Sequence, residues 1–328
     1  MKSFFRSVLI LGSLLMFGCN YAAVDSANVA EKGIKLYESG NLNKAMSTLQ
    51  SAVDRDPNND IALYWMARID MDYRDYQAAI PHLNEAAGIS PEQPLYWFTL
   101  AQAHAQQAEQ QFLDNQMDAA VVSYGECVKA ADKASKLDPY YAEAQLQAAR
   151  CHVGAGEYND AVDSYTQAIM SNPVMKSPQG VTEHYVELGK LYTRFGFHRE
   201  AESVLEDGLL HNAGDGQMES AMGDVLFDMK NYRGALAHYE MAYKFLDKSG
   251  SMLRALDAMY GAGAASFELA LIEKDKAQIR EYTEKLEVAK SWFERYAEHA
   301  TVDTEKLRRA AALAKISEID DILKELNI

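Results

Sequence analysis

The sequence is poor in proline and in basic residues, and both shortages limit what the protein can be. Its 328 residues include only 7 prolines. Proline removes a backbone hydrogen-bond donor, so its scarcity, together with frequent alanine, favours helices. The 32 basic residues are outnumbered by 48 acidic ones, which gives a formal net charge of -16. A nucleic-acid binder usually needs a basic surface to replace counterions, so we expect no nucleic-acid partner.

The sequence also lacks the motifs that carry common enzyme chemistry. It has no HExxH, no phosphate-binding glycine loop that ends in Lys-Ser or Lys-Thr, and no GxSxG. The stretch GAGAAS, Gly261 to Ser266, lacks the third glycine of a dinucleotide loop, and no strand pattern precedes it. Small residues at a helix crossing explain it better. We therefore predict a protein that is not an enzyme and that has no catalytic residue, cofactor or metal site.

Long apolar runs are missing except for one near the N-terminus. Lys2 and Arg6 are followed by an apolar stretch from Val8 to Phe17. A helix of that length reaches about 15 Å, half of a hydrocarbon core of about 30 Å. The run is therefore too short to span a membrane, and its basic start is typical of an export signal. Tyr21 is too large for the small-residue pattern of an ordinary cleavage site.

The end of this run resembles the bacterial lipoprotein signal. In the sequence MFGC, the small residue Gly18 precedes Cys19. The resemblance implies a signal peptide over 1–18, lipidation of Cys19, for example with palmitate, and a lipidated tether over 19–25. By the same analogy, Asn20 implies the bacterial outer membrane, with the protein facing the periplasm. A simple cleaved signal, which would release a secreted periplasmic protein, is the alternative.

The rest of the chain contains an internal repeat of small residues. A small residue is followed by others 12 and 19 residues later, and in three copies by proline 24 residues later. Large apolar residues such as Leu49 and Leu83 stand 16 residues after the first small one. Small residues let two antiparallel helices approach, large ones fill the space around them, and proline stops the second helix. Clear copies start from Gly33, Ala67, Ala149, Gly189 and Gly223.

This pattern resembles the tetratricopeptide repeat. The resemblance implies an all-α fold, namely a right-handed superhelical array of helix hairpins over 26–249 with about six repeats. It also implies that partner proteins bind as extended peptides in a groove lined by the first helix of each repeat.

The third repeat is longer than the others. From Ala101, the matching residues Cys127, Ala134 and Pro139 follow at offsets of 26, 33 and 38 instead of 12, 19 and 24. The excess of 14 residues equals about four helical turns. We predict that each helix of this repeat is two turns longer, with the turn near Asp114-Asn115.

Residues 250–328 are predicted to form a long hairpin of the same kind and a capping helix. Met252 to Ile272 and Lys276 to His299 are the two expected hairpin helices. Thr304 to Leu326 has apolar residues mostly at three- and four-residue steps, which indicates an amphipathic helix. We expect this helix to cover the apolar end of the array. A helix that binds a partner is the alternative.

Two segments conflict with the repeat pattern. Pro81 falls near the start of the second helix of the second repeat, where we expect a kink or a late helix start. Residues 176–181 contain Pro178 and Gly180 and are predicted to be a connecting loop, with a small hinge as the alternative.

The candidate groove occupies fixed positions on the first helices. Its basic residues predict a peptide ligand with acidic groups or a free carboxylate, held by charge-assisted hydrogen bonds. Neutralisation of nearby acids is the alternative role for these bases. Val186, Ser220 and Asp224 hold equivalent positions in later repeats. The predicted groove residues are Tyr64, Arg68, Phe98, Gln102, Leu146, Arg150, Lys190 and Arg194.

Cysteine and histidine give weaker signals. Besides Cys19, the chain has only Cys127 and Cys151. An exported protein can hold a disulfide, but both residues also fit buried positions of the repeat, so the two alternatives stay open. His104 and His152 share one repeat position, which we interpret as a packing position and not as a metal site.

These observations together predict a non-enzymatic envelope lipoprotein that binds or assembles partner proteins through its groove. The predicted partners are envelope proteins or peptides, and the membrane through the lipid anchor. The alternative is a structural envelope protein that self-associates through the groove or the C-terminal helix. Concentration-dependent light scattering would distinguish the two.

Overall fold

The computed structural model describes residues 22–171, 178–248, 250, 252–274 and 279–326, and this described part contains helices and no strand. The predicted signal peptide over 1–18 and the predicted lipidation site Cys19 lie outside the described residues. None of the described helices is long and apolar enough to cross a membrane.

The chain divides into two compact units, Met1–Val174 and Met175–Ile328, which we call unit 1 and unit 2. This division falls inside the array that the sequence places over 26–249. The expected domain boundary between residues 249 and 250 stays a prediction.

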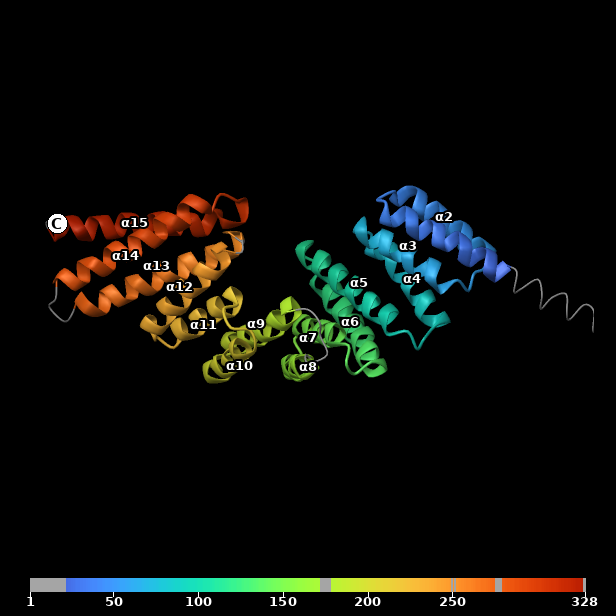
Figure 1. Cartoon of the computed structure of the whole chain (residues 1–328), viewed down its shortest axis with the longest axis horizontal. Helices are drawn as coiled ribbons and strands as arrows, with labels where there is room; N and C mark the ends of the chain where they lie inside the picture. The colour runs from blue at the N-terminus through green and yellow to red at the C-terminus, as the bar shows by residue number, and fades with distance from the viewer. Residues whose placement is uncertain (1–21, 172–177, 249, 251, 275–278, 327–328) are drawn as a thin grey trace, which may run out of the picture. The chain divides into compact units, whose positions relative to one another are not determined.

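Unit 1 consists of antiparallel helix hairpins that follow one another along the chain (Figure 1). A helix over residues 22–38 shares a core with α2, and α3 pairs with α4, α5 with α6 and α7 with α8. The bounds are α2 Leu42–Arg55, α3 Asp60–Asp72, α4 Tyr76–Ile89, α5 Pro94–Leu113, α6 Met117–Leu137, α7 Ala142–Ala155 and α8 Tyr158–Met170.

The small residues of the repeat lie where the helices of a hairpin meet. A Cβ atom added to Gly33 would lie 2.7 Å from Cγ of Leu49, and one added to Gly223 would lie 2.6 Å from the ring of Tyr239. Both distances are too short for carbon atoms in contact. The large side chain 16 residues later therefore fills the space that a side chain at Gly33 or Gly223 would need. The interpretation of the small-residue period as a packing requirement is confirmed at these positions.

The third repeat has the predicted long helices. α5 has 20 residues and α6 has 21, whereas α7 and α8 have 14 and 13. Asp114 ends α5, and Asn115 takes a φ of 60° in the turn, a left-handed conformation that asparagine tolerates better than most residues. The turn therefore lies where the excess of 14 residues predicted it.

Of the two expectations for Pro81, the late helix start is wrong, and the kink stays a prediction. α4 begins at Tyr76, and Pro81 lies inside it. The helix starts early because the side chain of Asp75 accepts a hydrogen bond from the backbone N–H of Ala78, which caps the first turn. Burial of Leu83 and of the alanines on the same face offsets the backbone donor that proline lacks.

The expectation of a loop over 176–181 is also wrong for residues 178–181. Helix α9 spans Pro178–Arg194 and so begins with Pro178 itself. Proline is well suited to the first position of a helix, because the N–H it lacks would have no partner inside the helix. Residues 176 and 177 lie outside the described part.

Unit 2 continues with hairpins and ends in a single helix (Figure 1). α9 pairs with α10, α11 with α12 and α13 with α14, and α15 packs on α14 after a 3-10 turn over Asp303–Glu305. The remaining bounds are α10 His198–His211, α11 Gly216–Asp228, α12 Tyr232–Lys248, α13 Met252–Lys274, α14 Ile279–His299 and α15 Lys306–Glu325.

Helix α15 contributes to the core of unit 2. Ala312 and Ile319 are fully buried in a cluster with residues of α13 and α14. Nε of Arg309 donates to the carbonyl oxygen of Ala297 at 2.7 Å, and Nζ of Lys290 donates to Asp320 at 2.6 Å. These contacts support the capping interpretation of this helix. Leu307 at its start is exposed, so the partner-binding alternative stays a prediction.

Candidate partner-binding groove

Unit 2 contains a groove on the first helices of its repeats, and its volume is about 130 Å³. Side chains from α9, α11 and α13 line it, together with Leu246 of α12. They include Val186, Lys190, Ser220 and Asp224, which hold the repeat positions that the sequence assigned to the groove. Gln217, Ala221, Arg254 and Asp257 complete the lining.

Asp224 lies at the centre of the charges in this groove. The hydroxyl of Tyr239 donates to its carboxylate at 2.7 Å. The surrounding protein desolvates the carboxylate, and this raises the pKa of Asp224 against the opposing effects of Tyr239 and Lys190. The charge of Asp257 raises this pKa further, whereas that of Arg308 lowers it. Because desolvation disfavours the charged form, a nearby cation or hydrogen-bond donor stabilises the Asp224 carboxylate.

Arg308 of the C-terminal helix α15 lies near the charged residues Asp224 and Asp257. Its guanidinium forms an ion pair with Asp257, and its Cζ atom lies 4.5 Å from the ring centroid of Tyr260. Burial lowers the pKa of Arg308. The hydrogen bond to Asp257 and the nearby charges raise it by more, so the pKa of Arg308 is raised overall. Arg308 was not among the predicted groove residues, because in the sequence it is only a polar residue of an amphipathic helix.

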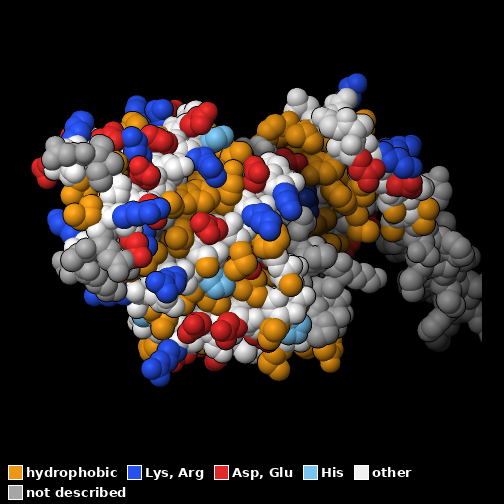
Figure 2. Space-filling model, turned by 60° about the vertical axis from the view of Figure 1, so that its left-hand side comes forward, with side chains coloured by type: hydrophobic (Ala, Val, Ile, Leu, Met, Phe, Trp, Pro, Cys, Tyr) orange, Lys and Arg blue, Asp and Glu red, His pale blue; other side chains and the backbone are white. Residues whose placement is uncertain are grey.

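Arg254 is the basic residue of this groove that is open to a ligand. It is exposed, and within the described part of the chain it has neither an ion pair nor a hydrogen-bond partner. Lys190 is also exposed, with Asp224 as its nearby acid. Figure 2, in which unit 2 comes forward, shows acidic and basic side chains mixed over that face with apolar ones between them.

Two of the predicted groove residues in unit 1 contact each other. Nη1 of Arg68 donates to the hydroxyl of Tyr64 at 3.2 Å. Tyr64 is buried, and its ring centroid lies 5.3 Å from that of Tyr96. Because the Arg68 guanidinium is partly buried and bound to a neighbouring tyrosine, its contacts here are those of packing within the array.

The other predicted residues of unit 1 differ in exposure. Phe98 is half-buried with its ring centroid 5.0 Å from that of Tyr141, and Gln102 is half-buried as well. Leu146 is buried, and Arg150 is exposed. Phe98 and Leu146 thus contribute mainly to packing between helices, and Gln102 and Arg150 remain accessible.

Lys190 and Arg194 belong to unit 2. Lys190 lines the groove, and Arg194 is exposed with its Cζ atom 5.9 Å from the ring centroid of Phe195. Arg68 and Arg150 belong to unit 1, so the basic strip predicted along the whole array stays a prediction.

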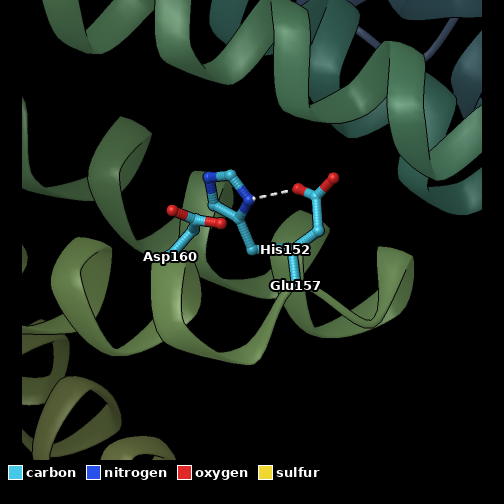
Figure 3. A group of neighbouring side chains, drawn as sticks. All are labelled: His152, Glu157 and Asp160. Carbon is cyan, nitrogen blue, oxygen red and sulfur yellow. Dashed lines mark hydrogen bonds and ion pairs between the residues drawn. The ribbon is translucent and has the colours of Figure 1, made fainter.

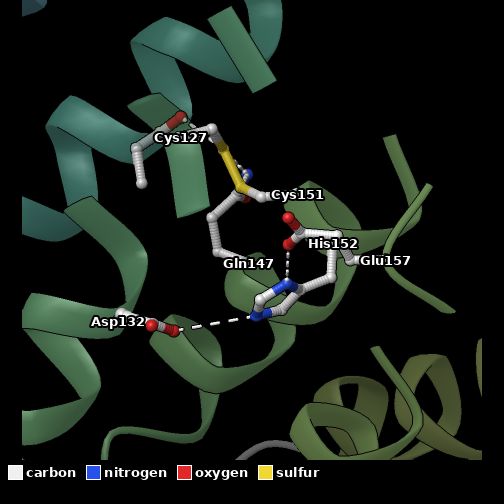
Figure 4. The surroundings of a disulfide bond; sticks show 7 residues. Cys127, Asp132, Gln147, Cys151, His152 and Glu157 are labelled. Atoms are coloured by element: carbon white, nitrogen blue, oxygen red, sulfur yellow. Dashed lines mark hydrogen bonds and ion pairs between the residues drawn. A yellow bond between two sulfur atoms is a disulfide. The ribbon is translucent and has the colours of Figure 1, made fainter. Parts of the chain in front are cut away.

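A disulfide joins the third and fourth repeats. Cys127 of α6 is bonded to Cys151 of α7, and their Cα atoms are 5.7 Å apart, within the range of disulfides (Figure 4). The amide nitrogen of Gln147 donates to Sγ of Cys151 at 3.5 Å. Of the two alternatives for these cysteines, the structure contains the disulfide. No signal in the sequence distinguished this disulfide from two buried thiols.

His152 lies next to this disulfide and between two acids. Its Nδ1 is 2.8 Å from Glu157 and its Nε2 is 3.7 Å from Asp132 (Figure 4). Asp132 and then Glu157 raise the pKa of His152, although burial of the ring works against them. The residue therefore packs in the interior, as predicted, and it also forms ion pairs that the sequence did not reveal.

Asp160 lies near His152 and Glu157, so that one histidine and two acids are close together (Figure 3). Their potential ligand atoms lie within 4.8 Å of one another. The helix ends explain the grouping, because His152 is in the last turn of α7 and the two acids begin α8. Glu157 already binds the ring, and the expectation of no metal site stays a prediction.

Comparisons with known proteins agree with this fold. Residues 36–102 match the sequence model of the tetratricopeptide repeat. No curated protein matches the chain. The solved C-terminal part of a repeat-containing protein from Cytophaga hutchinsonii is similar with a TM-score of 0.59 and 11% identity, over 83% of this chain and 100% of that one.

A tetratricopeptide repeat protein from Parabacteroides merdae is similar with a TM-score of 0.54 and 14% identity, over 90% of this chain and 98% of that one. The expected fold class, an all-α array of tetratricopeptide hairpins, is therefore confirmed. Such repeats bind protein partners on extended concave surfaces, which indicates a role in protein–protein interaction or as a scaffold.

Proposed function

We propose that this protein is a non-enzymatic scaffold of the bacterial envelope that holds a segment of a partner protein in the groove of unit 2. One observation carries the proposal: Arg254, without an ion-pair or hydrogen-bond partner in the described part of the chain, stands beside Lys190 and the apolar side chains of Val186 and Leu246. A basic pair next to an apolar wall suits a peptide that offers both a carboxylate and an apolar side chain.

The groove also limits which peptide fits. Asp224 and Asp257 lie in the same lining, so a uniformly acidic chain would meet repulsion there. The structure therefore favours a segment with one acidic group or a terminal carboxylate near Arg254, and with a donor or cation that reaches Asp224.

Photocrosslinking in cells tests this proposal. We expect a photoreactive amino acid at Gln217, in the groove, to crosslink to a defined protein segment, and the same amino acid at exposed Glu206 on α10 to give no such product. The double variant Arg254→Glu, Lys190→Glu should remove the Gln217 product by charge repulsion. Arg199→Glu with Arg233→Glu is the matched control, because both arginines are exposed outside the groove. An unchanged Gln217 product in the groove variant would overturn the proposal.

The envelope location rests on the sequence and is supported by the disulfide. Disulfides persist in oxidising compartments such as the periplasm, which agrees with an exported chain. We expect mass spectrometry of the mature N-terminus to find acylated Cys19. Stable anchoring needs more than one acyl chain, and Cys19 is the proposed attachment site. Cys19→Ser should therefore move the protein from the membrane fraction to the soluble fraction. A mature chain that begins beyond Cys19 would contradict lipidation and favour the secreted periplasmic alternative.

A further inference from the structure

The tip of the long α5–α6 hairpin forms an apolar surface that the groove does not explain. Its exposed apolar residues lie in the last turn of α5 and the first turns of α6. Leu113 is 84% exposed and Val122 is 65% exposed. Apolar patches of this kind mark interaction sites more often than chance. The surface, which we call the hairpin tip, consists of Phe112, Leu113, Met117, Val121 and Val122.

The hairpin tip projects past the repeat that follows it. A Cβ atom added to Gly154, at the end of α7, would lie 2.3 Å from the ring of Tyr124. The last turn of α7 is therefore level with Tyr124, and the residues of α6 before Tyr124 extend beyond it. The added helical turns bury little apolar surface of their own, so stability alone does not account for these side chains.

On its other side, the hairpin tip borders a hollow of about 350 Å³ next to the turn between α3 and α4. Tyr73 and Tyr76 form one wall, and the glutamines at 107, 110 and 111 form the other. The hollow gives a bound segment a second surface to contact beside the apolar side chains of the tip.

The charged residues on the hairpin tip itself are all acidic. The sequence has no Lys or Arg between Arg74 and Lys129. Glu109, Asp114 and Asp118 are exposed on the tip itself. Arg74 lies across the hollow and is accompanied there by Asp75. An apolar surface with an acidic rim is complementary to an apolar surface with a basic rim.

We propose that the hairpin tip is a second docking site, whose occupant is a basic amphipathic helix of another protein. Such a helix has an apolar stripe flanked by Lys and Arg, and it can lay the stripe on Leu113 and Val122 while its bases face Glu109, Asp114 and Asp118. A second copy of this chain would bring two acidic rims together, and an anionic lipid surface would repel the same rim. Both are therefore disfavoured as occupants.

Fluorescence anisotropy with two synthetic peptides tests the chemistry of the site. Both peptides are helical with leucine at three- and four-residue steps, and their other positions are mainly lysine in one and glutamate in the other. We expect the full chain to bind the lysine peptide at least about tenfold more tightly. Leu113→Asp with Val122→Asp should weaken that binding about tenfold, because the apolar contact is lost.

The matched control is Leu210→Asp with Leu307→Asp, which changes two leucines elsewhere that are 83% and 88% exposed and adds the same charge. It should leave the affinity within about twofold. Because both variants make the protein more acidic, general charge attraction would tighten binding in each. Tighter or unchanged binding by the tip variant, or equal loss in the control, would overturn the proposal.

Crosslinking in cells identifies the natural occupant. A photoreactive amino acid at Val122 should capture a segment that is net positive and has apolar residues at three- and four-residue steps. It should still do so in the Arg254→Glu, Lys190→Glu variant, because the site is independent of the groove. Capture of a second copy, a lipid or an acidic segment would overturn the proposal.

Discussion

His152 shows how neighbouring acids can change the pKa of a buried side chain. It is almost fully buried, yet Glu157 and Asp132 approach its two ring nitrogens. The repeat pattern placed this side chain in the interior and said nothing of the acids, because they come from α6 and from the turn before α8. Burying the protonated ring costs less free energy because both acids can pair with it.

The ion pairs of His152 predict how stability changes with pH. The folded-state pKa of His152 is raised above its ordinary value of 6.5. The protonated ring therefore stabilises the folded state fully below about pH 6.5, and this contribution is lost as the pH rises through the folded pKa. We expect His152→Gln to lower the free energy of unfolding by about 1–2 kcal/mol near pH 6, and by less at pH 8.

Chemical denaturation followed by circular dichroism, at a series of pH values, measures this difference. His211→Gln is the control, because His211 is exposed and its nearest acid is the exposed Asp207. A difference between wild type and His152→Gln that stays constant from about pH 6 to 8 would show that the ring does not titrate in this range.

At the scale of elements, the disulfide ties α6 to α7 and thus the extended repeat to the next one. The sequence separation of its cysteines is 24 residues. Closing a loop of that length lowers the entropy of the unfolded chain and stabilises the fold by about 3 kcal/mol. We expect a reducing agent to lower the thermal midpoint of the Cys19→Ser protein. The triple variant Cys19→Ser, Cys127→Ala, Cys151→Ala should not respond to it.

The state of the two thiols provides a direct check. In the Cys19→Ser background, the unreduced and unfolded protein should have no free thiol that reacts with a thiol reagent. Full reactivity of both cysteines would contradict the disulfide, whatever the thermal midpoint.

Helix α15 is the element whose role was hardest to assign from sequence. Its fully buried Ile319 packs in the core with α13 and α14. We expect Ile319→Ala to destabilise unit 2 by about 2–4 kcal/mol, because it leaves a cavity. Leu307→Ala, at an exposed site of the same helix, should change stability by less than about 0.5 kcal/mol. Equal effects of the two variants, measured by denaturant unfolding, would argue against a structural role for α15.

At the scale of the whole molecule, the two units place their accessible charges differently. Unit 2 has a groove with both signs of charge, in which Arg254 is open to a ligand. In unit 1, Arg68 is hydrogen-bonded to Tyr64, and the hairpin tip has an acidic rim. The two proposed sites differ in chemistry and would hold two different partners, and the groove and tip variants distinguish the two proposals.

The sequence by itself determined the hairpins, their order and the longer third repeat. These follow from the spacing of small and large residues, because close packing of two helices admits only a small residue at positions such as Gly33 and Gly223. Local signals predicted the helix ends less well. Pro81 predicted a kink or a late helix start, yet α4 begins at Tyr76 and contains this proline.

Only the tertiary structure decided which charged and sulfur-containing side chains meet. Arg308 pairs with Asp257 of the groove, although the two residues are 51 positions apart in the sequence. Cys127 meets Cys151, and His152 meets Asp132, across the contact between α6 and α7. Such pairs depend on how side chains of different helices are directed in space, and a repeat period fixes the backbone register but not these directions.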